Sequence, residues 1–528
     1  MAVPGEVFIL ALDLGTSACK VDLISEHGEV IGHEAEVLPV YYLENGGAEQ
    51  DVEACWRAFV RCAQRLIGQR LAPVESIVAV CAATHGFGTV AVDGDGKPLH
   101  RVMLWLDARG AEYARQLVGG FLVGYAPRKL LQWIRLTGGA PSLSGKDTIG
   151  HLLFLREQLP EVYRETHKFL DVLSYFDFRL TGRMVSTADN AATTWLADNR
   201  DLRQIRYHPS LLAQVGLPLD RLPQIVGCTE VLGPLRPAVA DELGLSTKVQ
   251  VVGGAFDLPA AALGAGAAGD FEPHLSIATS SFITVHVPFK KTDVFHSMAS
   301  LPSGRPDRYL LLAEQEIAGG SLVFLRDQVF FPQDALGEAP PPEDFFDRVN
   351  RLAAESPAGS RGVLFAPWLY GERAPVDDPW LRGMFFNLSV DTTRADMLRA
   401  VLEGVALNTR WILGPVERFC GRRMNALRVA GGGAQSEVWC QIYADVLDRD
   451  ILQLESPIHA TARGAAFLAL VGLGRMRFEE ISQRVPVQRR YLPNLERRAV
   501  YDEQFRAFVD LYAGTHAIAR RLNRAREA

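Results

Sequence analysis

Apolar residues near the start of the chain fall into short runs, and each run ends at a turn signal. The runs cover residues 7–12, 18–25 and 29–37, with Asp13–Ser17 and His27–Gly28 between them. Short apolar runs bounded by Gly, Asp and Ser are typical of strands. The pattern predicts an antiparallel meander of three strands, with Asp13 facing the surface on the first turn.

The next segment changes to helical spacing. Asp51 is placed to cap a helix whose apolar residues, from Val52 to Ala63, recur every three or four positions. Ile77–Cys81 is uniformly apolar, as in a strand that is buried on both faces. A meander followed by a helix and a buried strand predicts an α/β domain.

About half a chain later the same arrangement returns. Runs at 275–278 and 282–287 flank the hydroxyl-rich turn Thr279–Ser281. We interpret the repeat as two similar α/β halves joined near Gly264–Gly269, with domains at 1–268 and 269–528 and both turns facing one ligand in a cleft. Two unrelated hairpins would give the same pattern. The chain is predicted to end in a long polar helix over 494–528, capped by Asn494.

Composition narrows the functional classes. The 528 residues are 48% hydrophobic and 22% charged, with a net charge of −7. These values exclude a small binding module and argue against a disordered chain or a dedicated nucleic-acid binder. The apolar segment 251–268 contains Asp257 and Pro259 and is too broken to span a membrane. Seven scattered cysteines without a CxxC pair indicate buried thiols in a reducing compartment, so a cytoplasmic protein is expected.

Two apparent phosphate loops fail on their context. Gly264–Gly269 fits G-x-G-x-x-G, but a helical segment precedes it where a dinucleotide fingerprint needs a strand. Gly139–Lys146 resembles a P-loop with one residue too many, and Asp147 stands where Ser or Thr should bind Mg²⁺. Neither segment is interpreted as a nucleotide site.

The turn Asp13–Ser17 is the more informative feature. A carboxylate at a strand end can hold Mg²⁺ while turn N–H groups and the hydroxyls of Thr16 and Ser17 meet phosphate oxygens. Lys20 adds a cation that could reach the same phosphates. An ordinary structural turn is the alternative.

Two further segments could complete a phosphate site. The predicted strand 427–430 leads into Gly431–Ala434 and then a helix over 435–447, so a nucleotide could lie against bare backbone at a helix N-terminus. A tight strand-to-helix turn would look the same. The strand from Val251 leads through two glycines to Asp257, which is either a helix cap or a base at the cleft.

Together, in this order and at these distances, the motifs resemble the FGGY carbohydrate kinases, and within that family the xylulokinases. The resemblance runs from about residue 7 to about residue 490 and covers the segments 13–17, 105–109, 253–257, 275–281, 371–375, 400–406 and 431–434. Several motifs in register are far more specific than any one of them.

The resemblance implies a fold and an activity. The fold is α/β, with two actin/hexokinase-like (ribonuclease H-like) domains, each built on a mixed five-stranded sheet, and an ATP/sugar cleft between them. The activity is transfer of the γ-phosphate of Mg-ATP to a hydroxyl of a small sugar, a ketopentose such as xylulose being favoured. ATP and Mg²⁺ are the implied cofactors and a small sugar is the implied partner, without nucleic acid or membrane and with a homodimer left open.

The resemblance also assigns roles. Asp257 matches the catalytic general base and Asp13 the Mg²⁺-associated acid. The remaining residues divide between the sugar pocket, with His85, Thr84, Asp107, Asp257 and Leu258, and the nucleotide site, with Gly15, Thr16, Ser17, Lys20, Thr279, Ser280, Gly431, Gly432, Gly433, Ala434 and Ser436.

Departures from the family pattern concern the substrate. Leu258 stands where related kinases carry Asn or Gln, and Leu106 where a xylulokinase carries Asn. Another sugar or polyol, such as ribulose, a pentitol or a tetritol, is therefore an alternative. A non-catalytic sensor or an actin-like filament protein could share the fold, but a sensor has no need of Asp13, Lys20 and Asp257 together.

Overall fold

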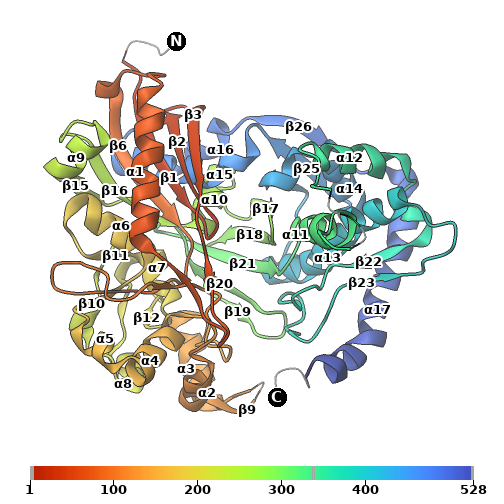
Figure 1. Cartoon of the computed structure of the whole chain (residues 1–528), viewed down its shortest axis with the longest axis horizontal. Coiled ribbons are helices and arrows are strands. Elements are labelled where there is room, and N and C mark those ends of the chain that lie inside the picture. The colour runs from red at the N-terminus through yellow and green to blue at the C-terminus, as the bar shows by residue number, and fades with distance from the viewer. Residues whose placement is uncertain (1–4, 123, 336, 338, 525–528) are drawn as a thin grey trace.

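Two large sheets organise the molecule (Figure 1). The computed structural model describes residues 5–122, 124–335, 337 and 339–524. The first sheet has the order β15 (Val231–Pro234), β16 (Gln250–Phe256), β6 (Ile77–Thr84), β1 (Phe8–Leu14), β2 (Ala18–Ser25), β3 (Val30–Val37). The second has the order β19 (Thr292–Asp293), β20 (Met298–Pro302), β21 (Tyr309–Gln315), β18 (Ser281–Val287), β17 (Pro273–Ile277), β24 (Ala426–Ala430), β25 (Asp450–Leu454), β26 (Val487–Tyr491).

The two sheets share one topology. In the first, β1 pairs antiparallel with β2 and parallel with β6, and β6 pairs parallel with β16. In the second, β17 pairs antiparallel with β18 and parallel with β24, and β24 pairs parallel with β25. The prediction of two similar halves is confirmed. The prediction of five strands per sheet is wrong, because β15 extends the first sheet, and β19, β20 and β26 extend the second, by antiparallel pairing at the edges.

Strand pairing also moves two predicted boundaries. β1 continues through Asp13 to Leu14, and β6 continues past Cys81 to Thr84. Both extensions occur because β1 has a partner on each side, with Leu14 opposite Cys19 on β2 and Thr84 on β6. Asp13 is consequently a strand residue and only 6% exposed, so the expectation of a surface-facing acid is wrong.

Helices cover the sheets and their connections. They are α1 (Val52–Gly68), α2 (Ala111–Val118), α3 (Pro127–Thr137), α4 (Thr148–Gln158), α5 (Pro160–Glu165), α6 (Val172–Thr181), α7 (Ala188–Thr193), α8 (Pro209–Val215), α9 (Pro237–Leu243), α10 (Asp257–Gly264), α11 (Gly320–Leu325), α12 (Phe345–Glu355), α13 (Arg394–Cys420), α14 (Glu437–Leu447), α15 (Ala460–Gly472), α16 (Ile481–Arg484) and α17 (Arg498–Arg524). The shorter strands are β4 (Tyr41–Tyr42), β5 (Ala48–Gln50), β7 (Val90–Val92), β8 (Val102–Met103), β9 (Gly119–Leu122), β10 (Lys168–Leu170), β11 (Val185–Thr187), β12 (Ala197–Asp198), β13 (Arg206–Tyr207), β14 (Gln224–Val226), β22 (Leu364–Ala366) and β23 (Met384–Phe386).

Helix ends follow their capping residues. Asp51 caps α1 as predicted, because its side chain accepts a hydrogen bond from the Glu53 amide. Asn494 caps the 3₁₀ turn Leu495–Arg497 instead of the long helix, which begins at Arg498. The seven cysteines are buried and unpaired, as predicted. In the part of the chain that the structure describes, no helix is both long and apolar enough to cross a membrane.

The halves meet where α10 and α15 cross. These helices are topological counterparts, because α10 follows β16 in the first half and α15 follows β25 in the second. A Cβ at Gly264 would lie 1.7 Å from the Ala460 carbonyl oxygen, and one at Gly464 would lie 1.8 Å from the Ala260 carbonyl oxygen. Only glycine permits this reciprocal approach of two backbones.

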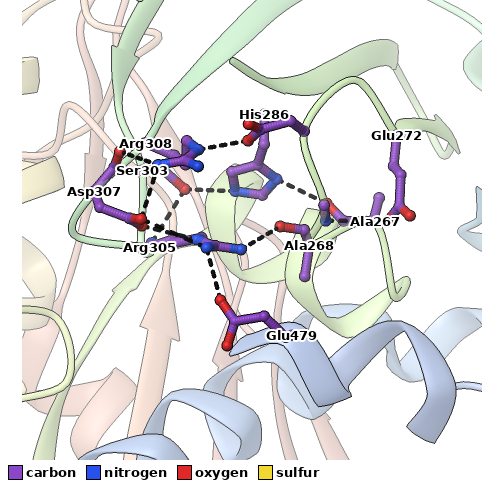
Figure 2. A network of polar contacts seen from close by, with 11 residues as sticks. Ala267, Ala268, Glu272, His286, Ser303, Arg305, Asp307, Arg308 and Glu479 are labelled. Carbon is purple, nitrogen blue, oxygen red and sulfur yellow. Dashed lines mark hydrogen bonds and ion pairs between the residues drawn. The ribbon is translucent and has the colours of Figure 1, made fainter. Parts of the chain in front are cut away.

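Basic side chains hold the segment that joins the halves. The neutral His286 ring donates from Nδ1 to the Ala267 carbonyl at 2.7 Å, and Arg305 donates to the Ala268 carbonyl at 3.1 Å (Figure 2). Arg463 and Arg428 donate to the carbonyls of residues 264 and 265. Burial lowers the pKa of His286 to about 4, which keeps the ring neutral at physiological pH. A glycine- and alanine-rich linker, which has no polar side chains of its own, is thereby fixed through its backbone.

Candidate active site

An ion pair lies at the end of the first hairpin. The register of β1 and β2 sets Asp13 directly opposite Lys20, and Lys20 Nζ lies 3.1 Å from Asp13 Oδ2. Desolvation raises the pKa of Asp13 and Lys20 lowers it, with a net upward shift, while the charge of Asp13 raises the pKa of Lys20. The structure brings together the acid and the cation that the sequence singled out, and buries the acid.

The turn at residues 15–17 has protein hydrogen-bond partners at Gly15 and Thr16, whereas Ser17 faces solvent. The Gly15 amide donates to the Ala18 carbonyl at 3.0 Å. Trp105 Nε1 donates to the Thr16 hydroxyl at 3.0 Å, and Gln50 donates to the Thr16 carbonyl at 2.8 Å. Ser17 is exposed. Of the two turn hydroxyls, that of Ser17 is the one presented to solvent.

Asp257 is the first residue of α10 and does not cap it. Phe256 occupies the cap position without a side-chain bond, and its amide donates to buried Asp189 at 2.8 Å. Desolvation and then the charge of Asp13 raise the pKa of Asp257 to about 7, with a smaller contribution from Glu314 on β21. The cap interpretation of Asp257 is therefore wrong, and its carboxyl group titrates near neutral pH.

His85 lies between these two acids in the order of the sheet. It follows β6, the strand between β1 and β16, and its amide donates to the Leu14 carbonyl at 2.9 Å. The ring is buried, and neither nitrogen has a hydrogen-bond partner among the described residues. Burial lowers the pKa of His85 to about 4. An unpaired buried imidazole is costly unless a ligand satisfies it. The preceding Thr84 is fully buried, and its hydroxyl donates to the His85 carbonyl at 3.3 Å.

Asp13, His85 and Asp257 thus share one edge of the first sheet. Each lies at or just beyond the carboxyl end of one of three adjacent parallel strands, which is where ligands bind in open α/β sheets. Leu258 comes next on α10 and is partly exposed. Leu106 is also partly exposed and packs against the core of this half.

Asp107 has protein partners for both carboxylate oxygens. One oxygen lies 2.6 Å from Arg109 Nη2 and also accepts from the Ala48 amide, while the other accepts from the Arg109 backbone and side chain. Arg109 in turn pairs with Glu49 at 2.7 Å. These contacts show that Asp107 fixes the position of Arg109. Contact between Asp107 and a sugar stays a prediction.

The second half presents a turn without charge. Thr279 is exposed and its hydroxyl has no protein partner within the described ranges, whereas its carbonyl accepts from the amides of Ala318 and Gly320 at the start of α11. Ser280 is half-buried, and its carbonyl accepts from the Ala278 amide at 3.0 Å. The predicted hydroxyl turn is present on β17–β18, as the repeat indicated.

The glycine loop lies beside this turn because β24 is the parallel neighbour of β17. A Cβ at Gly431 would lie 2.6 Å from the Ile277 carbonyl oxygen, and one at Gly433 would lie 2.4 Å from Ile277 Cγ2. A Cβ at Gly432 would meet nothing within 4 Å. The tight turn explains the two outer glycines, and Gly432 is the one that leaves bare backbone toward open space.

The end of the loop departs from the predicted helix. A 3₁₀ turn, Gly432–Gln435, precedes α14, which begins at residue 437 and not at 435. Ser436 caps α14 by accepting from the Trp439 amide at 3.0 Å, and its hydroxyl donates to Asn350 at 2.6 Å. Ala434 is buried. The nucleotide roles of Ser436 and Ala434 stay predictions.

Comparison with known proteins decides the family. Residues 8–264 match the model of the FGGY family of carbohydrate kinases, N-terminal domain, and residues 275–473 match that of the C-terminal domain. The chain belongs to the FGGY family of carbohydrate kinases. It is an ATP-dependent sugar phosphotransferase with the two-domain actin/hexokinase-like fold.

Relatives cover nearly the whole of this kinase. It is 29% identical to a xylulose kinase of Staphylococcus epidermidis over 512 residues, which are 96% of this chain and 97% of that protein. It is 26% identical to a gluconokinase of Bacillus subtilis, over 96% of this chain and 95% of that one. The crystal structure of a gluconate kinase from Lactobacillus acidophilus superimposes with a TM-score of 0.84 at 25% identity, covering 98% of this chain and all of that one.

One residue of this kinase, Glu314, was not singled out from the sequence, whereas its partner Arg373 lies in the family segment 371–375. Glu314 pairs with Arg373 at 2.6 Å, and Arg373 also contacts Glu316 at 3.1 Å. Glu314 contributes to the raised pKa of Asp257, although it belongs to the other half of the chain. An acid near the end of the apolar strand 309–315 is a signal that could have drawn attention to it.

Proposed function

We propose that this kinase transfers the γ-phosphate of Mg-ATP to a hydroxyl of a ketopentose such as xylulose, with Asp257 as the general base. The observation that carries the proposal is the Asp257 carboxyl group, which does not cap α10. Its pKa of about 7 suits a base at neutral pH. The xylulose kinases among the relatives support the choice of sugar.

In this mechanism Asp257 accepts the proton of the attacking hydroxyl. Lys20 and the turn hydroxyls stabilise charge on the transferred group, and the neutral His85 ring orients the sugar through a hydroxyl. The backbone at Gly432 approaches the nucleotide. Protein groups fixed before the reaction lower its barrier because they need not reorganise as charge develops.

Asp13 fits a shared magnesium site. No group of three or more His, Cys, Asp or Glu side chains in the described residues could hold a metal by itself. Mg²⁺ commonly takes one or two protein carboxylates together with nucleotide phosphates and waters, and Asp13 would supply one such carboxylate. When bound there, Mg²⁺ supplies positive charge to the phosphates.

The test is a screen of ATP consumption on D-xylulose, D-ribulose, pentitols, tetritols and D-gluconate, with product identification by mass spectrometry. We expect the highest kcat/KM on a ketopentose. Gluconate is included because a gluconokinase matches over nearly the full chain. A higher kcat/KM on gluconate or a polyol would overturn the choice of sugar, and tight ATP binding without any product would favour a sensor.

Three predictions stay open beside the proposal. The domain boundary at 268/269, the cytoplasmic location and the homodimer each need their own measurement. Light scattering after size-exclusion chromatography measures the oligomeric state directly.

A further inference from the structure

A cavity of about 680 Å³ lies on the second half of the chain, and the residues discussed above as the candidate active site do not line it. Its walls come from the second half of α13, the first half of α17, the turn after α14, residues 295–296 and residues 375–376. Segments far apart in the sequence therefore build one concave surface, of a size that accepts a small organic molecule.

Arginine dominates the charged lining. Arg410, Arg418, Arg423, Arg449 and Arg498 face the cavity, against two acids, Glu417 and Asp448. Arg449 is buried and lies 2.7 Å from Glu417, and Asp448 pairs with Arg423, Arg449 and Arg498. Arg410 and Arg498 also pair with Asp502, which lies just outside the lining, so five arginines stand against three acids and the charge around the cavity stays positive.

Two arginines keep donors for a ligand. The Arg418 side chain is exposed and makes no hydrogen bond or ion pair with any described residue. Arg423 uses only Nη2, for the backbone and carboxylate of Asp448, and leaves Nε and Nη1 without a partner in the described chain. Guanidinium groups with free, forked donors match the oxygens of a phosphate group.

Apart from His296, which pairs with Asp293 at 2.7 Å, the rest of the lining is apolar. Phe295 is 82% exposed, Trp411 is partly buried against the core, and Phe505 carries the Arg410 guanidinium 4.5 Å above its ring. Aromatic side chains that remain exposed beside a cavity offer an apolar ligand body a surface to cover.

The α13 wall carries two poor helix formers at the cavity, although the helix is continuous there. Gly414 and Pro415 lie inside this long helix and both face the opening. Pro415 has no N–H for the Trp411 carbonyl, and a Cβ at residue 414 would meet only Arg418 Nη1, at 3.5 Å. Gly and Pro are both poor helix formers. Because Gly414 has no side chain, this part of the α13 wall leaves space beside Arg418.

We propose that this cavity binds a small organic phosphate, with the phosphate group at Arg418 and Arg423 and the apolar body against Phe295 and Trp411. The ligand class follows from the lining, since a free inorganic ion would leave the aromatic surface exposed and a neutral apolar molecule would leave the guanidinium donors unpaired. The site is separate from the phosphoryl-transfer site and does not depend on the sugar proposed above.

The test is calorimetric titration of phenyl phosphate into the full-length kinase, with a saturating non-hydrolysable ATP analogue so that the phosphate positions of the catalytic site are filled. We expect saturable binding that is tighter than that of inorganic phosphate or benzyl alcohol. Arg418→Ala should weaken it about tenfold, as expected for loss of one charge-assisted hydrogen bond, and Arg418→Lys should weaken it less. Arg203→Ala, at a side chain that is 89% exposed and outside the cavity, is the matched control.

Three results would overturn the proposal. The first is no saturable binding of phenyl phosphate at millimolar concentration. The second is an affinity that Arg418→Ala leaves unchanged while circular dichroism shows the variant folded. The third is a dimer in light scattering that Phe295→Ser converts to monomer, because the cavity would then be a surface between two copies.

Discussion

The two halves of this kinase carry the same turn on the same topology but with different chemistry. Asp13 and Ser276 are each the penultimate residue of the central strand, β1 in the first half and β17 in the second. Asp13 forms an ion pair with Lys20, whereas the Ser276 carbonyl accepts a hydrogen bond from the Ser281 hydroxyl. The first turn therefore carries charge and the second only neutral groups.

The asymmetry continues two strands further across each sheet. Asp257 follows β16, is partly buried and has its pKa raised by desolvation and by the charge of Asp13, while its counterpart after β25, Glu455, is exposed. The second half instead offers the bare backbone of Gly432. A duplicated fold supplies two equivalent edges, and the proposed function places proton transfer and charge neutralisation at the first and nucleotide contact at the second.

The largest effect is expected at the base. Asp257→Asn should lower kcat on every substrate by roughly 10²–10⁴, the usual contribution of a general base. The counterpart variant Glu455→Gln should leave kcat unchanged. Steady-state assays with an ATP-analogue binding control measure both, and equal losses in the two variants would erase the distinction between the halves.

Asp13→Asn should lower kcat by about 10²–10³, in the range found when one group that stabilises transition-state charge is removed. Ser276→Ala, at the equivalent position, should change kcat by far less. Because Asp13 is buried, thermal melting must accompany the assay. A folded Asp13→Asn enzyme with near wild-type turnover at limiting Mg²⁺ would remove Asp13 from the site.

The prediction for Leu258 concerns substrate specificity and not the chemical step. An apolar wall discriminates between sugars by only about 1–3 kcal/mol, because it leaves no buried polar group unpaired. Leu258→Asn should shift kcat/KM toward D-xylulose within that range, while kcat on the best substrate changes little. An unchanged substrate profile would show that Leu258 does not contact the sugar.

The pH dependence tests the charges around the base. With a pKa of about 7, Asp257 is deprotonated and active above that pH, so kcat/KM should fall about tenfold per unit as the pH decreases below 7. Removing the neighbouring negative charge with Glu314→Gln should lower the pKa and move this limb to lower pH. A profile that is flat between pH 5 and pH 8 would exclude Asp257 as the titrating base.

The smallest effects are expected for the two turn threonines, Thr16 and Thr279, whose valine variants should differ in thermal stability. Thr16→Val removes the acceptor of Trp105 and should reduce the free energy of unfolding by about 1 kcal/mol. Thr279→Val removes a hydroxyl that has no protein partner in the described residues and should leave the melting temperature unchanged. Equal melting temperatures for the two variants would mean that the Trp105 contact contributes nothing.

Local patterns in the sequence determined the repeated meander, the cap of α1 at Asp51 and the order of strand, glycine loop and helix after Leu427. These features depend on neighbouring residues, because side-chain alternation and capping act over a few positions. The family motifs added the identity of Asp13, His85 and Asp257 as a set.

The tertiary structure determined the burial, the electrostatic surroundings and the contacts of those residues. Pairing of β1 on both sides buried Asp13, which the turn pattern had placed on the surface. Contact between the halves brought Glu314 within the electrostatic reach of Asp257, and the distant Ala48 amide donates to the Asp107 carboxylate. Burial, strand pairing and charge coupling join residues that lie tens to hundreds of positions apart, so no local pattern in the chain could specify them.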